Sequence, residues 1–311
     1  MRSLVPSFLG LAVALAGCGT TPERPSPEGA SSHAFATDLR VTAERELARA
    51  LTEAKATGGT ILVMTPQGDV LAEAGGHADQ PYVPGSTMKP LLLAAALDEG
   101  VVATQDTFDC SRGERGGKVV TDAFPLGRAA VPELVARSSN IGFAQIFDRL
   151  GGARTSRALE RFHFAVPPSL AAAPVGDYDG AMTAIGISIV ATPRQVTRAY
   201  AALANGGDGI VKPATAARMG VLLEGAVSSP EGTGKKAAVA GVRVAGKTGT
   251  SEQTGPDGVS RPYASFVGYV PAERPRYVIF VGVESPQGEA PWGGAVAAPV
   301  FSRVAAWALS H

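Results

Sequence analysis

Apolar residues recur at helical spacing in several stretches of the chain. Near the front, such positions run from Leu39 to Ala54. Thr37 or Asp38 can serve as the N-cap and Gly58 as the stop, which predicts an amphipathic helix between them. The C-terminal segment has the same pattern. We therefore expect one helix near each end of the folded chain.

The middle of the chain has further helical patterns. Residues 91–97 are mostly leucine and alanine and are followed by Gly100, a usual stop position. Residues 131–152 are typical of two helical segments separated by a turn at Ser138-Ser139-Asn140. Another helix is predicted with Pro193 near its start and an Asn-Gly-Gly at its end.

Strand-like runs occur near both ends of the chain. Residues 60–65 and 69–74 are joined by Pro66-Gln67-Gly68, which predicts a hairpin. Residues 244–285 contain several more β-rich runs. We expect these strands to form one antiparallel sheet in an α+β fold, with the terminal helices on one face and the central helices on the other.

Composition narrows the class of protein without changing this picture. The chain has 311 residues, 45% of them hydrophobic, and 28 basic residues balance 28 acidic ones. That length is enough for one large domain or two small ones. No basic excess is available to neutralise phosphates, so we expect no nucleic-acid partner.

Residues 1–17 are expected to lie outside the fold. Their apolar run is too short to span a bilayer but is typical of a signal peptide. The segment leads into Leu15-Ala16-Gly17-Cys18, which resembles a bacterial lipobox and makes Cys18 the predicted lipidation site. The alternative is a plain secretory signal with an unrelated cysteine. Residues 18–36 then form a flexible tether before a domain at 37–311, anchored by lipid in the cell envelope and facing the periplasm or the exterior.

Metal and disulfide chemistry are not expected. The chain has only two cysteines, Cys18 and Cys110, and lipidation of the first leaves the second without a partner. Its four histidines form no cluster with cysteines, so we predict no metal site and no other cofactor. His77 and His163 have no motif around them and are expected at the surface or in packing.

Ser86-Thr87-Met88-Lys89, at the front of the leucine-rich helix, is a candidate reaction centre. A serine and a lysine three residues apart on a helix lie on one face, and a lysine of lowered pKa can take the proton of the serine. The alternative is a capping serine and a solvated lysine, which one short motif cannot exclude. Two later motifs, Ser138-Ser139-Asn140 and Lys247-Thr248-Gly249-Thr250, follow in the order typical of penicillin-recognising serine enzymes.

From about Asp38 to the C-terminus, the chain resembles the transpeptidase domain of class B penicillin-binding proteins. Besides the three motifs, similar pieces follow one another along the whole domain: TPQGDVLA, TFDC, TPRQVTRAYAALANGG, ASFVGYVPAERPRYVIFVGV and GGAVAAPVF. The resemblance implies a five-stranded antiparallel sheet covered by helices beside a mostly helical subdomain. This agrees with the pattern of predicted elements.

The resemblance also implies catalytic roles. Ser86 would attack the penultimate D-alanine carbonyl of a D-Ala-D-Ala stem peptide, and Lys89 would be its base. Burial or the charge of Lys247 would lower the pKa of Lys89. Ser138 would relay a proton to the leaving amine, and Asn140 would bind the substrate amide.

The third motif would bind the end of the substrate. Lys247, Thr248, Gly249 and Thr250 would hold the terminal carboxylate, and the backbone amides of Ser86 and Thr250 would form the oxyanion hole. The implied activity is that of a D,D-transpeptidase or D,D-carboxypeptidase, a choice that the sequence leaves open. β-Lactam antibiotics would acylate the same serine, and peptidoglycan would be the partner.

Two alternatives stay open. Class A β-lactamases use a Glu-x-x-x-Asn element between the second and third motifs, but Glu160, Glu224 and Glu231 lack an asparagine four residues later. Class D enzymes have valine where Asn140 stands. The other alternative is a lipid-anchored scaffold, because we find no counterpart of the large N-terminal domain of class B proteins and Ser188 stands where the family usually has a second glycine.

Overall fold

A computed structural model describes residues 27–255 and 257–311. The predicted signal peptide, Cys18 and the first part of the predicted tether lie outside the described residues. Within these ranges, no helix has both the length and the apolar character needed to cross a membrane.

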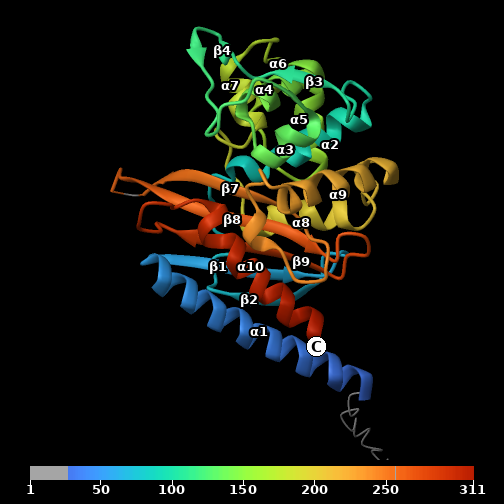
Figure 1. The fold of residues 1–311 in the computed structure, drawn as a ribbon, viewed down its shortest axis with the longest axis vertical. Coiled ribbons are helices and arrows are strands. Elements are labelled where there is room, and N and C mark those ends of the chain that lie inside the picture. The colour runs from blue at the N-terminus through green and yellow to red at the C-terminus, as the bar shows by residue number, and fades with distance from the viewer. Residues whose placement is uncertain (1–26, 256) are drawn as a thin grey trace, which may run out of the picture.

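A five-stranded antiparallel sheet lies at the centre of the fold (Figure 1). Its strands, in chain order, are β1 (Gly58–Met64), β2 (Val70–Ala74), β7 (Ala245–Thr254), β8 (Ser260–Val270) and β9 (Tyr277–Glu284). The spatial order is β2-β1-β9-β8-β7, so β1 pairs with β9 and β7 is an edge strand. The predicted hairpin and the predicted sheet, with strands from both ends of the chain, are therefore confirmed.

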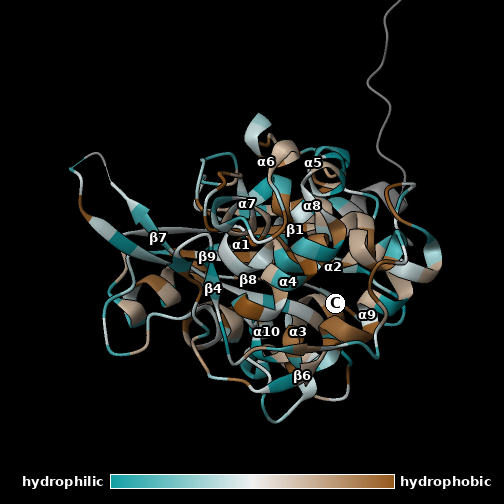
Figure 2. Ribbon diagram, turned by 90° about the horizontal axis from the view of Figure 1, so that it is seen from above, coloured by the Kyte–Doolittle hydropathy of each residue, from teal (hydrophilic) through white to brown (hydrophobic). Residues whose placement is uncertain are grey.

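The terminal helices cover one face of this sheet, as predicted. They are α1 (Pro27–Ala54) and α10 (Gly293–Ser310), which contact β1, β2, β8 and β9 (Figure 1). Successive side chains of β1 alternate between the two faces: Ile61 and Val63 pack with α1 and α10, whereas Leu62 and Met64 belong to the larger core on the other side. Figure 2 shows apolar residues, in brown, on both the helices and the strands.

The opposite face carries helices from the middle of the chain. They are α8 (Pro193–Ala204), which packs on β1, β8 and β9, and α9 (Pro213–Ser228), which contacts β7. α8 starts as predicted, because the Thr192 hydroxyl accepts a hydrogen bond from the Gln195 amide and Pro193 occupies the first turn.

The predicted start of the first helix is wrong. α1 begins at Pro27 and not after Thr37 or Asp38, so residues 27–36, expected in the flexible tether, are helical. Phe35 stacks on Tyr277 and Trp307, with ring centroids 6.0 and 5.9 Å apart. This contact with β9 and α10 extends the apolar face of the helix beyond the predicted cap.

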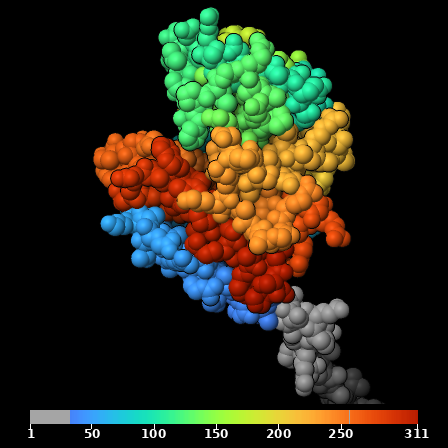
Figure 3. Space-filling model, viewed as in Figure 1, coloured from blue at the N-terminus to red at the C-terminus, as the bar shows by residue number. Residues whose placement is uncertain are grey.

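A mostly helical subdomain forms a separate lobe above the sheet (Figure 3). Its helices are α2 (Lys89–Asp98), α3 (Val131–Arg137), α4 (Asn140–Leu150), α5 (Gly152–Arg161), α6 (Pro168–Ala172) and α7 (Tyr178–Ala184). Two small ribbons join them: β3 (Thr107–Asp109) with β6 (Arg128–Ala130), and β4 (Glu114–Arg115) with β5 (Lys118–Val119). Short 3-10 turns, η1 (Gly85–Thr87) and η2 (Lys235–Ala237), complete the elements. The helical subdomain that the resemblance implies is therefore present.

Candidate active site

Ser86 lies in η1, immediately before α2. Pro90 has no amide hydrogen, so it cannot donate the α-helical hydrogen bond to the Ser86 carbonyl, four residues earlier. The Met88 amide instead bonds the Gly85 carbonyl at 3.0 Å, the spacing of a 3-10 turn. The leucine-rich helix is present where it was predicted. Its regular α-helical part begins at Lys89, however, and Ser86 lies in the 3-10 turn just before it.

Two contacts of Gly85 hold η1 in place, one of them against the third motif. Gly85 has φ 55°, and a Cβ there would lie 2.9 Å from the Thr250 carbonyl oxygen of β7. The Gly85 amide donates to the Gly186 carbonyl at 2.9 Å. Only glycine permits both this dihedral angle and this approach. Ser86 therefore lies beside Thr250, as the resemblance implies.

The amine of Lys89 joins the first motif to the second. Lys89 is fully buried, and its Nζ donates to the Ser138 carbonyl at 2.6 Å and to Asn140 Oδ1 at 2.7 Å. Ser138 Oγ lies 3.2 Å from the same nitrogen. Ser138 ends α3 in the left-handed conformation, at φ 60° and ψ 42°, and this turn presents both of its oxygens to Lys89.

The amine of Lys247 completes the cluster. This side chain is also fully buried, and its Nζ donates to Ser138 Oγ at 2.8 Å and to the Thr248 carbonyl at 3.1 Å. The hydroxyl of Ser138 therefore lies between two lysines that are far apart in the sequence. All three predicted motifs meet in one place.

Burial is the main cause of the lowered pKa values of the two lysines. It lowers the pKa of Lys89 to about 7, against an opposing effect of the nearby Asp122 carboxylate. Burial, and then the positive charge of Lys89, lower the pKa of Lys247 well below its ordinary value. Burial, one of the two predicted causes, therefore accounts for the low pKa of Lys89, while repulsion between the two amines acts on Lys247.

The third motif is held by the start of α10. The Gly293 amide donates to Thr250 Oγ1 at 3.1 Å, and a Cβ at Gly293 would lie 2.4 Å from the Gly249 carbonyl oxygen. Thr248 Oγ1 donates to Thr233 Oγ1 at 2.9 Å. These contacts fix the edge strand β7 next to η1.

Asp122 is a site residue that the sequence did not reveal. Its Oδ1 accepts hydrogen bonds from the Asn140 and Ile141 amides, and its Oδ2 accepts one from the Ser139 hydroxyl at 2.6 Å. It comes from the segment between β5 and β6, where no local motif distinguishes it from other turn-rich sequence. Only the fold brings it to α4.

The remaining predicted features lie apart from this cluster. His77 bonds Glu284 at 2.6 Å, and His163 is exposed. Ser188, where the family usually has glycine, is also exposed and is not among the described residues with positive φ, so serine needs no strained backbone there. The described part of the chain contains no group of three or more His, Cys, Asp or Glu residues able to hold a metal ion.

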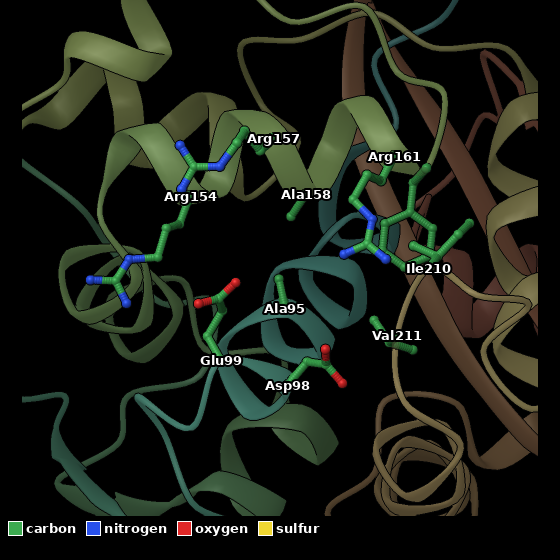
Figure 4. A pocket seen from close by; sticks show the side chains of 10 residues that line it. Ala95, Asp98, Glu99, Arg154, Arg157, Ala158, Arg161, Ile210 and Val211 are labelled. Atoms are coloured by element: carbon green, nitrogen blue, oxygen red, sulfur yellow. The ribbon is translucent and has the colours of Figure 1, made fainter.

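A separate hollow of about 280 Å³ lies at the opposite end of α2. Figure 4 shows Asp98, the last residue of α2, and the following Glu99 on one side of it and Arg154, Arg157 and Arg161 of α5 on the other. None of the residues of the three motifs lines it.

Comparison with known proteins agrees with this arrangement. The profile of the penicillin binding protein transpeptidase domain matches residues 58–306. Peptidoglycan D,D-transpeptidase FtsI of Escherichia coli is 27% identical over 318 residues, covering 86% of this chain and 53% of its own. Stage V sporulation protein D of Bacillus subtilis is 30% identical over 277 residues, covering 72% of this chain and 41% of its own. The chain thus spans about half the length of the curated relatives that it matches.

Solved structures give the same result. The crystal structure of a peptidoglycan glycosyltransferase from Burkholderia ambifaria is similar, with a TM-score of 0.77 and 28% identity over 88% of this chain and 95% of that one. The transpeptidase (TP) domain of penicillin-binding protein 3 from Burkholderia pseudomallei gives a TM-score of 0.74 and 27% identity over 86% and 92%. Since the domain profile covers most of the chain and the fold agrees, this protein belongs to the penicillin-binding-protein transpeptidase family.

Proposed function

We propose that this protein is a serine D,D-transpeptidase or D,D-carboxypeptidase that acts on the D-Ala-D-Ala stem peptides of peptidoglycan. The observation that carries the proposal is the pair of buried amines, Lys89 and Lys247, on either side of the Ser138 hydroxyl, one turn from Ser86. Two buried lysines are unfavourable for stability, and acyl transfer gives them a use.

Lys89 activates Ser86. A neutral lysine amine has two hydrogens and one lone pair. The two shortest bonds of Lys89, to the Ser138 carbonyl and Asn140 Oδ1, use the two hydrogens. The lone pair then accepts the proton of the Ser86 hydroxyl as substrate enters, since catalytic hydrogen bonds commonly shorten on substrate binding. With a pKa of about 7, Lys89 is neutral in about half of the molecules at neutral pH.

Attack by Ser86 Oγ on the penultimate D-alanine carbonyl forms a tetrahedral oxyanion. The Ser86 and Thr250 amides stabilise this charge, and the contact between η1 and β7 supports that pairing. The C–N bond then breaks, the acyl group stays on Ser86, and the leaving D-alanine amine takes a proton. Ser138 relays that proton, because its hydroxyl touches both lysine amines.

The acyl-enzyme is resolved by a second attack. An amine of a neighbouring stem peptide gives transpeptidation, and water gives carboxypeptidation. Either nucleophile loses its proton to the lysine pair, and Ser86 leaves with a proton restored.

Substrate orientation is assigned to the edge strand β7. Thr248 and Thr250 present hydroxyls, Lys247 adds positive charge, and Gly249 keeps the strand free of a side chain at its contact with η1. These groups hold the terminal carboxylate of the substrate. Asn140, whose amide already bonds Lys89 and the Thr121 carbonyl, contacts the substrate amide from the start of α4.

We further propose that Cys18 carries lipid and anchors the domain in the cell envelope. The small residues directly before Cys18 support this. Metabolic labelling with a palmitate analogue tests it: label should appear in the wild type and be lost in Cys18→Ser, and label on the variant would contradict the proposal.

Release of D-alanine from a D-Ala-D-Ala pentapeptide tests the activity. We expect release by the wild type, a loss of at least about 100-fold in Ser86→Ala, and no loss in the matched control Ser310→Ala at the end of α10. A cross-linked product with an added acceptor amine distinguishes transpeptidation from hydrolysis. If the wild type neither releases D-alanine nor binds penicillin covalently, the non-catalytic scaffold is supported instead.

A further inference from the structure

The first turn of α4 is tied to a distant carboxylate. A helix leaves its first amide hydrogens without helical partners. Here the amides of Asn140 and Ile141 donate to Asp122 Oδ1, and the Gly142 amide donates to Ser139 Oγ at 2.9 Å. Ser139 Oγ in turn donates to Asp122 Oδ2. Both oxygens of the Asp122 carboxylate thus accept hydrogen bonds from the second motif and the first turn of α4, and the position of the second motif depends on them.

This attachment sets the orientation of the Asn140 side chain. Its Nδ2 donates to the Thr121 carbonyl at 2.7 Å, next to the contact between Asp122 and the Asn140 backbone. With Nδ2 held there, Oδ1 faces the other way and meets Lys89 Nζ at 2.7 Å. Asn140 therefore connects the carboxylate to the lysine.

The charged groups near Lys89 come from different elements. Lys247 approaches from β7 and Asp122 from the segment before β6. The charge of Asp122 raises the pKa of Lys89, and the charge of Lys89 lowers the pKa of Lys247. The Cys110 thiol lies beside Ser139 at 3.5 Å, and burial raises its pKa, so it adds no charge. The arginines of α5 lie at the far end of α2 (Figure 4).

Asp98 and Lys212 also lie at that far end of α2. Asp98 accepts hydrogen bonds from the Lys212 amide and the Thr215 hydroxyl, and Lys212 Nζ donates to the Asp98 carbonyl. Asp122 is thus the carboxylate that acts on the amine of Lys89.

We propose that Asp122 is a positioning residue for the acyl-transfer reaction: it fixes Ser138, Ser139 and Asn140 against Lys89, and its negative charge makes Lys89 a stronger base. This inference rests on the proposed function. When Lys89 takes the proton of Ser86, the new ammonium keeps its bonds to Ser138 and Asn140, and the Asp122 charge stabilises it. Without that charge Lys89 binds its proton less tightly, so the neutral amine is a weaker base and stays neutral to a lower pH.

The acylation rate with a fluorescent penicillin, measured against pH, tests this. In Asp122→Asn the side-chain carbonyl can still accept the two backbone amides, so the shape of the turn is kept while the charge is lost. We expect the acid limb of the rate to move to lower pH by about 1 unit and the plateau to fall by about three- to tenfold. Asp177→Asn is the matched control, because Asp177 caps α7 through the Gly180 amide, outside the three motifs; its pH profile should equal that of the wild type.

The other outcomes, and a second variant, decide whether the inference holds. An Asp122→Asn profile with an unshifted acid limb, whatever its stability, would mean that Asp122 is only structural. Asp122→Glu keeps the charge on a longer side chain, so we expect the wild-type acid limb with a lower plateau. This variant carries the test if Asp122→Asn does not fold, and an unchanged plateau in it would overturn the positioning role. A wild type that is not acylated at any pH contradicts the proposed function, and this inference with it.

Discussion

Replacement of Lys89 by methionine should change how the stability of the protein depends on pH. A lysine with a pKa of 10.5 when unfolded and about 7 when folded binds more protons in the unfolded state between those values. Protonation therefore favours unfolding in this range. The resulting cost is fully present below pH 7 and shrinks as the pH rises toward 10.5.

The size of the effect follows from these two pKa values. Lys89 is fully buried, so no screening by solvent reduces the estimate. The cost of holding it in the folded state is about 4 kcal/mol at pH 7 and about 2 kcal/mol at pH 9. The free energy of unfolding of the wild type should therefore rise by about 2 kcal/mol from pH 7 to pH 9 relative to that of Lys89→Met. Removal of Lys89 also relieves the charge repulsion on Lys247, which changes the difference in the same direction.

Urea unfolding at about pH 7, 8 and 9 measures this. The free energy of unfolding of wild type minus that of Lys89→Met should rise steadily with pH, by about 2 kcal/mol in total. Lys236→Met, at an exposed lysine, is the control and should run parallel to the wild type. Parallel curves for wild type and Lys89→Met would refute the argument, because they would mean that the folded state does not lower the proton affinity of Lys89.

Further predictions concern backbone contacts and caps. Gly186 and Gly76 both have positive φ, but a Cβ at Gly186 would lie 2.2 Å from the Gly85 carbonyl oxygen, whereas Gly76 faces open space. Gly76→Ala should therefore lose about 1 kcal/mol of unfolding free energy and Gly186→Ala more than about 3 kcal/mol; equal losses in urea unfolding would contradict this contact. Ser139→Ala and Thr192→Ala each remove a helix cap and should each lose about 1 kcal/mol. Only Ser139→Ala should also slow acylation by a fluorescent penicillin. An unchanged acylation rate in this variant would mean that the cap of α4 does not affect the active site.

Much of the fold could be predicted because local patterns determine it. The apolar run of β1 and the turn at Pro66-Gln67-Gly68 are properties of the sequence itself, and the structure contains both the strand and the hairpin. The extension of α1 before Thr37 could not be predicted in the same way, because Phe35 packs there on Tyr277 and Trp307 from the other end of the chain. Thr37 and Asp38 gave a local N-cap signal, but the helix continues through them, and the aromatic contact of Phe35 lies on the N-terminal side of that signal.

The site shows the same division. Helical spacing brings Ser86 and Lys89 near each other, and the order of the three motifs predicted that they share a cleft. The acceptors of the Lys89 amine, however, lie on residues 49 and 51 positions away in the chain, and Asp122 has no motif of its own. Hydrogen bonds between elements are set by the tertiary fold, so spacing along the chain does not reveal them.

Covalent capture of Ser86 by a β-lactam is the most direct test of the proposed chemistry. The protein is incubated with benzylpenicillin, and its intact mass and peptide masses are measured over time. We expect one added penicillin, on the peptide that contains Ser86, which persists for minutes and is absent in Ser86→Ala. An adduct that disappears within seconds would favour a serine β-lactamase, and a wild type that gains no mass, or gains it on another residue, would contradict the assignment of Ser86 as the acylated nucleophile.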